Sequence, residues 1–390
     1  MEIRIGLPRI SGGGQEFNVS YPISGLDSPT LYFTVSGADR DFISDDLNAP
    51  LLALLPVAMA GGHDLVCDGP VSPEFLFHVR TAVLPLFLRS TPGTRHVTIR
   101  AEQTQPATLR GSPAVLAGLS NGIDSLCLYL QHSDPAAPER LRLTHFVFND
   151  FGSHSDTTDL RRQARFQARG KAVAASADQI GLPLVSIASN LGRILPYSTE
   201  QTHTLRNASV ALLLGGRAQT FLYASAVRFD DFSLDAGDTA FIDPILLPAI
   251  RTESLSSVSS GGQLSRVQKT AIVAEAEIAR DHLNVCVTSF PNCSQCWKCA
   301  RTIFTLELLG KDRLFERVFD LDKFQQVRTR YIAHVLLTSS RSPFARDILE
   351  LMRQRGFRAP FASRLRTAFA LPVAQVRPAY RRLIGFPAGH

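Results

Sequence analysis

The sequence lacks a hydrophobic run long enough to cross a membrane. Its longest apolar stretch, around residues 50–60, is much shorter than the roughly 20 residues that a membrane-spanning helix needs. The amino-terminal sequence MEIRIGLP also lacks the basic start and the apolar core of a secretory signal. We therefore expect a cytoplasmic protein with no membrane span.

Charged residues are also scarce. They make up 19% of the chain, whereas apolar residues make up 45%, a balance typical of a soluble globular protein with a sizeable core. At 390 residues the chain exceeds one typical domain, so we expect two domains and an extension. The sequence shows no internal repeat and leaves the oligomeric state open, a homodimer included.

The last fifty residues contain no lysine but ten arginines. Because Asp347 and Glu350 are their only acids, residues 341–390 carry a charge of +8, which leaves −2 for the remaining 340 residues. A basic tail of this kind can bind nucleic acid, an acidic protein or an anionic surface. The alternative is a solvated helical face packed on the chain's own acidic body, and the sequence leaves both interpretations open.

Residues 1–110 predict a smaller N-terminal α+β domain without a chemical motif. The pattern of apolar residues gives the following elements. Strands are expected at residues 2–5, 31–35 and 95–100, and helices at residues 44–58 and 75–88.

Residues 111–320 predict an α/β domain with a parallel sheet, because strands and helices alternate there. Beyond the apolar run that begins at Pro113, strands are expected at residues 143–148, 182–187 and 220–224, and helices at residues 159–180 and 201–214. The Ser/Gly-rich residues 254–263 predict a loop. Residues 321–390 predict a helical, Arg-rich C-terminal extension.

A tight polar loop, Ser120-Asn-Gly-Ile-Asp-Ser125, follows the apolar run and precedes a predicted helix. Such a loop directs backbone N–H groups and hydroxyls towards the positive end of a helix, where a phosphate chain binds. Gly122 lets the backbone approach a ligand closely, and Asn121 tolerates the left-handed conformation. Asp124 cannot favourably contact phosphate by itself, so we expect Mg²⁺ as its partner. The alternative is an ordinary strand-to-helix turn.

Cysteine is scarce as well, and its distribution is informative. Four of the six cysteines lie within fourteen residues, at Cys286, Cys293, Cys296 and Cys299. In a cytosolic chain such clustering indicates metal binding and not disulfides. Four thiolates suit a closed tetrahedral Zn²⁺ site that stabilises a fold. An iron–sulfur cluster uses the same ligands, and we favour zinc because nothing nearby indicates electron transfer.

The loop and the cysteine cluster together resemble one branch of the PP-loop ATP pyrophosphatase superfamily, the queuosine-pathway 7-cyano-7-deazaguanine synthase family. The loop of that superfamily reads Ser-Gly-Gly-x-Asp-Ser, with Asn121 here in place of one glycine. Asp150-Phe-Gly-Ser-His154 stands where the family has an Asp-Tyr-Gly-Gln-Arg-His-like segment. Arg206-Asn207 matches the family's Arg-Asn, and Lys269 matches a lysine before the cysteine site.

The resemblance covers about residues 113–310 and has clear limits. Ser153 replaces a glutamine of the family, and the family's Tyr-Pro-Asp-Cys segment is not recognisable after Phe229. The N-terminal module and the basic tail have no counterpart in the compact synthase. The chain is therefore similar to divergent members that carry an extra N-terminal domain.

The resemblance implies a Rossmann-type (HUP-like) PP-loop domain that uses ATP and Mg²⁺ beside a structural Zn²⁺. It implies a ligase that adenylylates a carboxylate or an amide, releases pyrophosphate and transfers the product to ammonia or an amine. The substrate would be a deazaguanine-type small molecule, another metabolite or a protein conjugate. The residues implied for ATP binding are Ser120, Asn121, Gly122, Asp124 and Ser125; those implied for catalysis are Asp124, Lys269 and Arg266; those implied for substrate binding are Arg206, Asn207 and His154.

Two other functions stay open from the sequence. The same activation could act on a base in nucleic acid, with the basic tail binding phosphates. A nucleotide-binding partner protein without catalytic activity is the other alternative, because Asn121 departs from the family's loop. Arg266 and Lys269 lie one helical turn apart, so they either face one anion together or are exposed helix charges.

Overall fold

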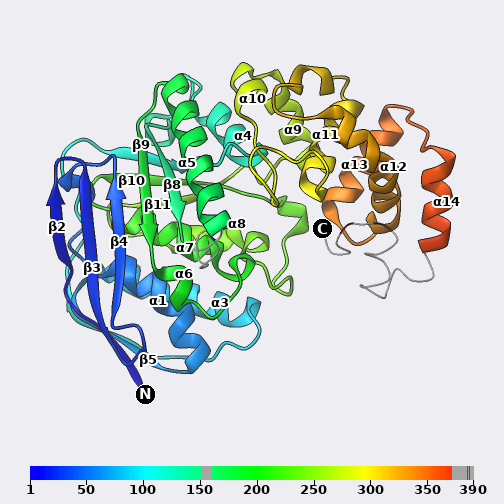
Figure 1. Cartoon of the computed structure of the whole chain (residues 1–390). Helices are drawn as coiled ribbons and strands as arrows, with labels where there is room; N and C mark the ends of the chain where they lie inside the picture. The colour runs from blue at the N-terminus through cyan, green and yellow to red at the C-terminus, as the bar shows by residue number, and fades with distance from the viewer. Residues whose placement is uncertain (152–159, 371–383, 385, 387–390) are drawn as a thin grey trace. The chain divides into compact units, whose positions relative to one another are not determined.

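The computed structural model describes residues 1–151, 160–370, 384 and 386, and it contains two compact units. Unit 1 comprises residues 1–119 and 128–262, and unit 2 comprises residues 120–127 and 263–390 (Figure 1). The domain boundaries that the sequence predicts near residues 110 and 320 remain predictions. Within the described ranges, no helix combines the length and the apolar character that a bilayer crossing requires.

Unit 1 is built on an eleven-stranded sheet with the order β11-β10-β7-β8-β9-β4-β3-β1-β5-β6, in which β2 pairs with β3 (Figure 1). The strands are β1 Glu2–Ile5, β2 Arg9–Gly13, β3 Glu16–Ser24, β4 Thr30–Ser36, β5 Asp64–Val71, β6 Ile99–Thr104, β7 Ala114–Gly118, β8 His145–Asp150, β9 Leu184–Ser189, β10 Ala218–Ala224 and β11 Ser256–Ser260.

The predicted parallel sheet is confirmed for β10, β7, β8 and β9, and β11, which the sequence did not predict, adds a fifth parallel strand beside β10. Their chain order places β7 in the middle and reverses between β7 and β10. In open α/β sheets, ligands bind outside the carboxyl ends of the strands at such a reversal. β7 ends at Gly118, directly before the loop at Ser120.

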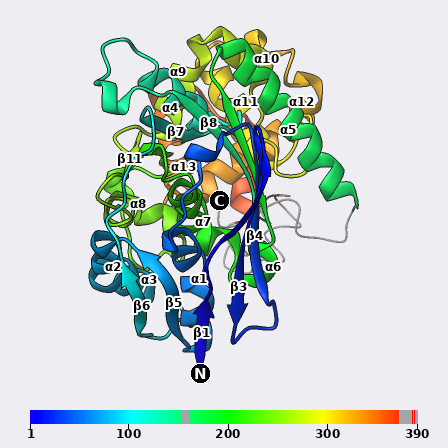
Figure 2. The same cartoon turned by 90° about the vertical axis from the view of Figure 1, so that its left-hand side faces the viewer.

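The N-terminal strands extend the same sheet. Strand β4 pairs antiparallel with β9, with Val35 opposite Ile187. Strands β3 and β1 follow, and β5 and β6 then run parallel to β1 (Figure 2). Residues 1–110 therefore share one sheet and one core with the parallel strands of unit 1.

The loop predicted at residues 254–263 is wrong, because residues 256–260 form β11 and pair in parallel with β10. Serine has a low strand propensity, so composition favoured a loop. The edge of a parallel sheet offers a complete row of backbone donors and acceptors, however, and any extended segment can use them. Here the pairing of Leu222 with Val258 fixes the register.

The helices of unit 1 agree with the predicted periodicity, and the helix expected at residues 75–88 occurs as α2 and α3 joined by a π-helical turn. Helix α1 is apolar on all sides and packs on α7, as a fully buried helix does. The helices are α1 Asn48–Gly61, α2 Pro73–His78, α3 Leu84–Ser90, α5 Leu160–Ile180, α6 Leu191–Ile194, α7 Thr199–Leu213 and α8 Asp243–Leu246; α4 Ile123–His132 begins in unit 2 and ends in unit 1.

Unit 2 is helical in its described part, as predicted for the C-terminal extension. Helix α11 packs against α9, α12 and α13. The helices are α9 Arg266–Glu275, α10 Glu277–His282, α11 Trp297–Leu308, α12 Leu321–Thr338, α13 Pro343–Gln354 and α14 Phe361–Ala370.

We expect Phe33→Ala to destabilise unit 1 by about 3–5 kcal/mol, the usual cost of truncating a buried aromatic side chain. Phe33 lies on β4, is fully buried and contacts the rings of Tyr21 and Phe151 edge to face. Hydrogen exchange should accelerate in both β4 and β9. The control Tyr32→Ala, at a side chain 42% exposed on the same strand, should change little. Unchanged exchange in β9 would contradict the shared core.

Candidate functional site

The loop at residues 120–125 is a compact turn that leads into α4. The hydroxyl oxygens of Ser120 and Ser125 are 3.1 Å apart, and the N–H of Gly122 donates to Ser120 Oγ at 3.3 Å. Asn121 has a φ of 57°, the left-handed conformation that the sequence predicted it would tolerate. Its carbonyl oxygen accepts a hydrogen bond from the N–H of Asn284, which ties the loop to the segment before the cysteines.

The structure brings Asp124 together with Arg266 and Lys269, which are distant in sequence. Asp124 Oδ2 lies 2.7 Å from Arg266 Nη2, and Asp124 Oδ1 lies 3.4 Å from Lys269 Nζ. A capping box at Ser265 starts α9, so Arg266 and Lys269 share the face of its first turn. The two cations thus face one anion, and within the chain that anion is the Asp124 carboxylate.

Two further cations, Lys298 and Arg301 on α11, lie in the same cluster. The Arg301 guanidinium carbon is 5.0 Å from the ring centroid of Trp297 and 4.3 Å from that of Phe344. Arg266 contacts the same Phe344 ring from 5.4 Å. The sequence did not single out Lys298 or Arg301. The spacing of Trp297 and Arg301, four residues apart on one helix, is the signal that could have found them.

Positive charge exceeds negative charge among these five side chains, and burial is the main cause of the lowered pKa values of three of the cations. Burial lowers the pKa of Lys269, which is 2% exposed, although Asp124 opposes the effect. Burial and repulsion by Arg301 and Arg266 lower the pKa of Lys298 to about 8. Burial and repulsion by Arg266 lower the pKa of Arg301 to about 10. A bound anion would stabilise the charged forms of Lys269, Lys298 and Arg301, so a site with these lowered pKa values favours anion binding.

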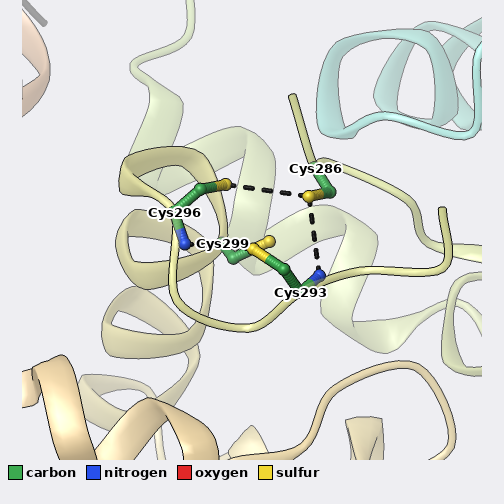
Figure 3. A group of neighbouring side chains, drawn as sticks. All are labelled: Cys286, Cys293, Cys296 and Cys299. Atoms are coloured by element: carbon green, nitrogen blue, oxygen red, sulfur yellow. Dashed lines mark hydrogen bonds between the residues drawn. The ribbon is translucent and has the colours of Figure 1, made fainter. Parts of the chain in front are cut away.

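The four clustered cysteines converge at one point, as predicted. Their sulfur atoms all lie within 4.8 Å of one another, and Figure 3 shows them reaching together from a loop and the start of α11. Within the described residues they are the one group of three or more potential ligands found. Cys286, Cys293, Cys296 and Cys299 could therefore hold a metal ion such as Zn²⁺.

Backbone amides around the sulfurs also fit a metal-bound thiolate. The N–H of Ser289 donates to Cys286 Sγ at 3.3 Å, and the N–H of Cys296 donates to Cys293 Sγ at 3.1 Å. Ser294, buried with a φ of 60°, provides the tight turn between Cys293 and Cys296. Such hydrogen bonds stabilise negative charge on sulfur and orient the ligands. They do not distinguish zinc from an iron–sulfur cluster.

Two of the residues predicted to bind substrate, Arg206 and Asn207, line a cavity of about 60 Å³ in unit 1. Arg206 is buried and donates to Thr202 Oγ1 at 2.7 Å and to the carbonyl oxygen of Phe151 at 2.6 Å, so it supports the cavity wall. Asn207 accepts a hydrogen bond from Asn149 at 2.9 Å. His154 lies outside the described residues. The remaining lining residues are Phe151, Thr199 and His203.

We expect the purified chain to contain about one equivalent of Zn²⁺, and Cys293→Ser to lose most of it. Loss of one of four thiolates removes the closed coordination that gives a structural zinc site its affinity. Elemental analysis after dialysis measures the metal. Cys67→Ala is the control, because Cys67 is buried in unit 1 away from the cluster. Iron with a visible charge-transfer band would show an iron–sulfur cluster instead, and a metal-free wild type would contradict both.

Comparison with known proteins found no matching family model, no matching curated protein and no matching solved structure.

Proposed function

We propose that the chain is an ATP-dependent ligase that cleaves ATP between its α- and β-phosphates. The observation that carries the proposal is the convergence of Arg266 and Lys269 on Asp124, at the first turn of the helix that follows the Ser120 loop. Cations, loop hydroxyls and a helix N-terminus together suit a phosphate chain better than any one of them alone.

The proposed reaction has two steps. A carboxylate or amide oxygen of the substrate attacks the α-phosphorus, and the bond to the bridging oxygen breaks, so pyrophosphate leaves with the electron pair. Ammonia or another amine then attacks the activated carbon, the bond to the AMP oxygen breaks, and the nitrogen loses a proton. Negative charge develops on the departing pyrophosphate, where fixed cations lower the barrier.

Lys269 and Arg266 would supply that charge stabilisation. Both side chains are held by Asp124 before ATP arrives, so little reorganisation is needed when phosphate replaces part of that contact. Both oxygens of Asp124 already face cations, Arg266 at Oδ2 and Lys269 at Oδ1. Asp124 therefore fits the role of positioning the cations better than the expected role as a Mg²⁺ ligand.

The chain path supports the same proposal. β7 ends at Gly118, and the phosphate-loop candidate follows directly and leads into α4. A loop that opens a helix is a common phosphate-binding position. The metal site would have a structural role, since Cys296 and Cys299 lie at the first turn of α11 and bound metal would fix that turn.

We expect wild type to convert ATP to AMP and pyrophosphate when supplied with an acceptor and ammonium. A deazaguanine carboxylic acid is the first acceptor to test, followed by a small-molecule cell extract. Lys269→Met should lower the rate by about 10²- to 10³-fold, the usual cost of removing one transition-state contact. The control Lys311→Met removes a lysine of unit 2 that pairs with Glu275 and should leave the rate unchanged.

Chromatographic separation of AMP, ADP and phosphate measures the outcome, and mass spectrometry detects an AMP adduct. Release of ADP and phosphate would contradict the proposal. Tight ATP binding without turnover would indicate a non-catalytic nucleotide-binding protein. Turnover that requires a polynucleotide would overturn the small-molecule ligase in favour of base modification.

A further inference from the structure

Arg301 is a buried cation whose hydrogen-bonding capacity is largely unused. Its exposure is 7%, and its Nε and Nη1 atoms have no hydrogen-bond partner among the residues that the structure describes. A guanidinium carries five N–H donors, and burying them without hydrogen-bond acceptors is unfavourable in an apolar setting. Such a cost is usually offset by a ligand.

Aromatic rings fix the guanidinium but cannot neutralise it. Trp297 and Phe344 contact Arg301, with ring centroids 5.0 and 4.3 Å from the guanidinium carbon, so they restrict its position. Asp124 attracts Arg301, but its two oxygens already contact Arg266 Nη2 and Lys269 Nζ. The charge of Arg301 therefore remains without a carboxylate of its own in this cluster.

Arg328, also in unit 2, is a comparable arginine whose charge is paired within the chain. Its guanidinium also lies near two aromatic rings, those of Phe304 and Phe357. In contrast to Arg301, it forms a bidentate ion pair with Glu307, including a bond of 2.8 Å from Nε to Oε2. Glu307 thus neutralises the charge of Arg328 within the chain, so Arg328 provides a matched control for Arg301.

We propose that Arg301 is a binding residue for a phosphoryl oxyanion and shares that anion with Arg266. The planar fork of arginine matches two oxygens of a phosphoryl group, and both guanidinium groups lie close to one ring, that of Phe344, at 5.4 and 4.3 Å from its centroid. With Lys269 and Lys298 nearby, the excess of cations suits a multiply charged anion better than a single carboxylate. The inference rests on the proposed function, in which this anion is the pyrophosphate end of ATP.

The test is titration calorimetry of the full chain with inorganic pyrophosphate, inorganic phosphate and ATP. Arg301→Met keeps the length of the side chain between Trp297 and Phe344 and removes the charge. We expect pyrophosphate affinity to fall about 10- to 100-fold, the effect of losing one charge-assisted contact. Arg328→Met should bind pyrophosphate as wild type does. Arg301→Lys keeps the charge without the fork and should give an intermediate affinity.

Thermal unfolding separates binding from a structural role. If Arg301 serves to bind an anion, the ligand-free Arg301→Met variant should have an unfolding temperature equal to or higher than that of wild type. The reason is that the substitution removes an unpaired buried charge. Pyrophosphate should then raise the unfolding temperature less than in wild type. A destabilised Arg301→Met with unchanged pyrophosphate affinity would overturn the inference, and Arg301→Lys decides the matter if the Met variant does not fold.

The outcomes for the inference and for the proposed function are distinct. Pyrophosphate binding that depends on Arg301, without any cleavage of ATP, would support the anion site and reject the ligase. Binding of pyrophosphate by neither wild type nor variant would reject the anion site. Tight binding of ATP without binding of pyrophosphate would also reject the anion site. In that case the protein would recognise a part of ATP other than its terminal phosphates.

Discussion

The contact between the Asp124 carboxylate and the cations of α9 is the interaction that holds the cation cluster of unit 2 together. Arg266, Lys269 and Arg301 are buried or nearly so, and like charges in a low-dielectric setting repel strongly. A single carboxylate lets them remain together. It does not match their number, however, and this imbalance makes the cluster suited to a further anion.

The cysteine cluster and the cation cluster share a helix. Cys299 and Arg301 lie two residues apart on α11, and Cys296 caps that helix. A metal bound by the four thiolates would therefore hold the turn that presents Arg301 between its aromatic neighbours. A metal at the four cysteines would in this way support the proposed anion site, because ligation would fix the helix start from which Arg301 projects.

The sheet of unit 1 illustrates how far local sequence patterns reach. Alternating strands and helices predicted four of the five parallel strands, β7, β8, β9 and β10, because burial on both faces requires continuous apolar runs. The serine-rich strand β11 and the pairing of β4 with β9 could not be predicted in this way. Both depend on backbone hydrogen bonds to a neighbour that is distant in sequence, and side-chain composition does not report them.

The sequence by itself predicted the βαβ pattern, the tolerance of Asn121 for the left-handed conformation, the spacing of Arg266 and Lys269 by one helical turn, and the clustering of four thiols. Each of these follows from residue types at short spacing. Only the tertiary structure decided that Asp124 faces those cations and that Arg301 joins them. Asp124 and these cations lie more than a hundred residues apart in the sequence. How strongly their charges interact depends on how deeply the side chains are buried, and a local sequence pattern does not report that burial.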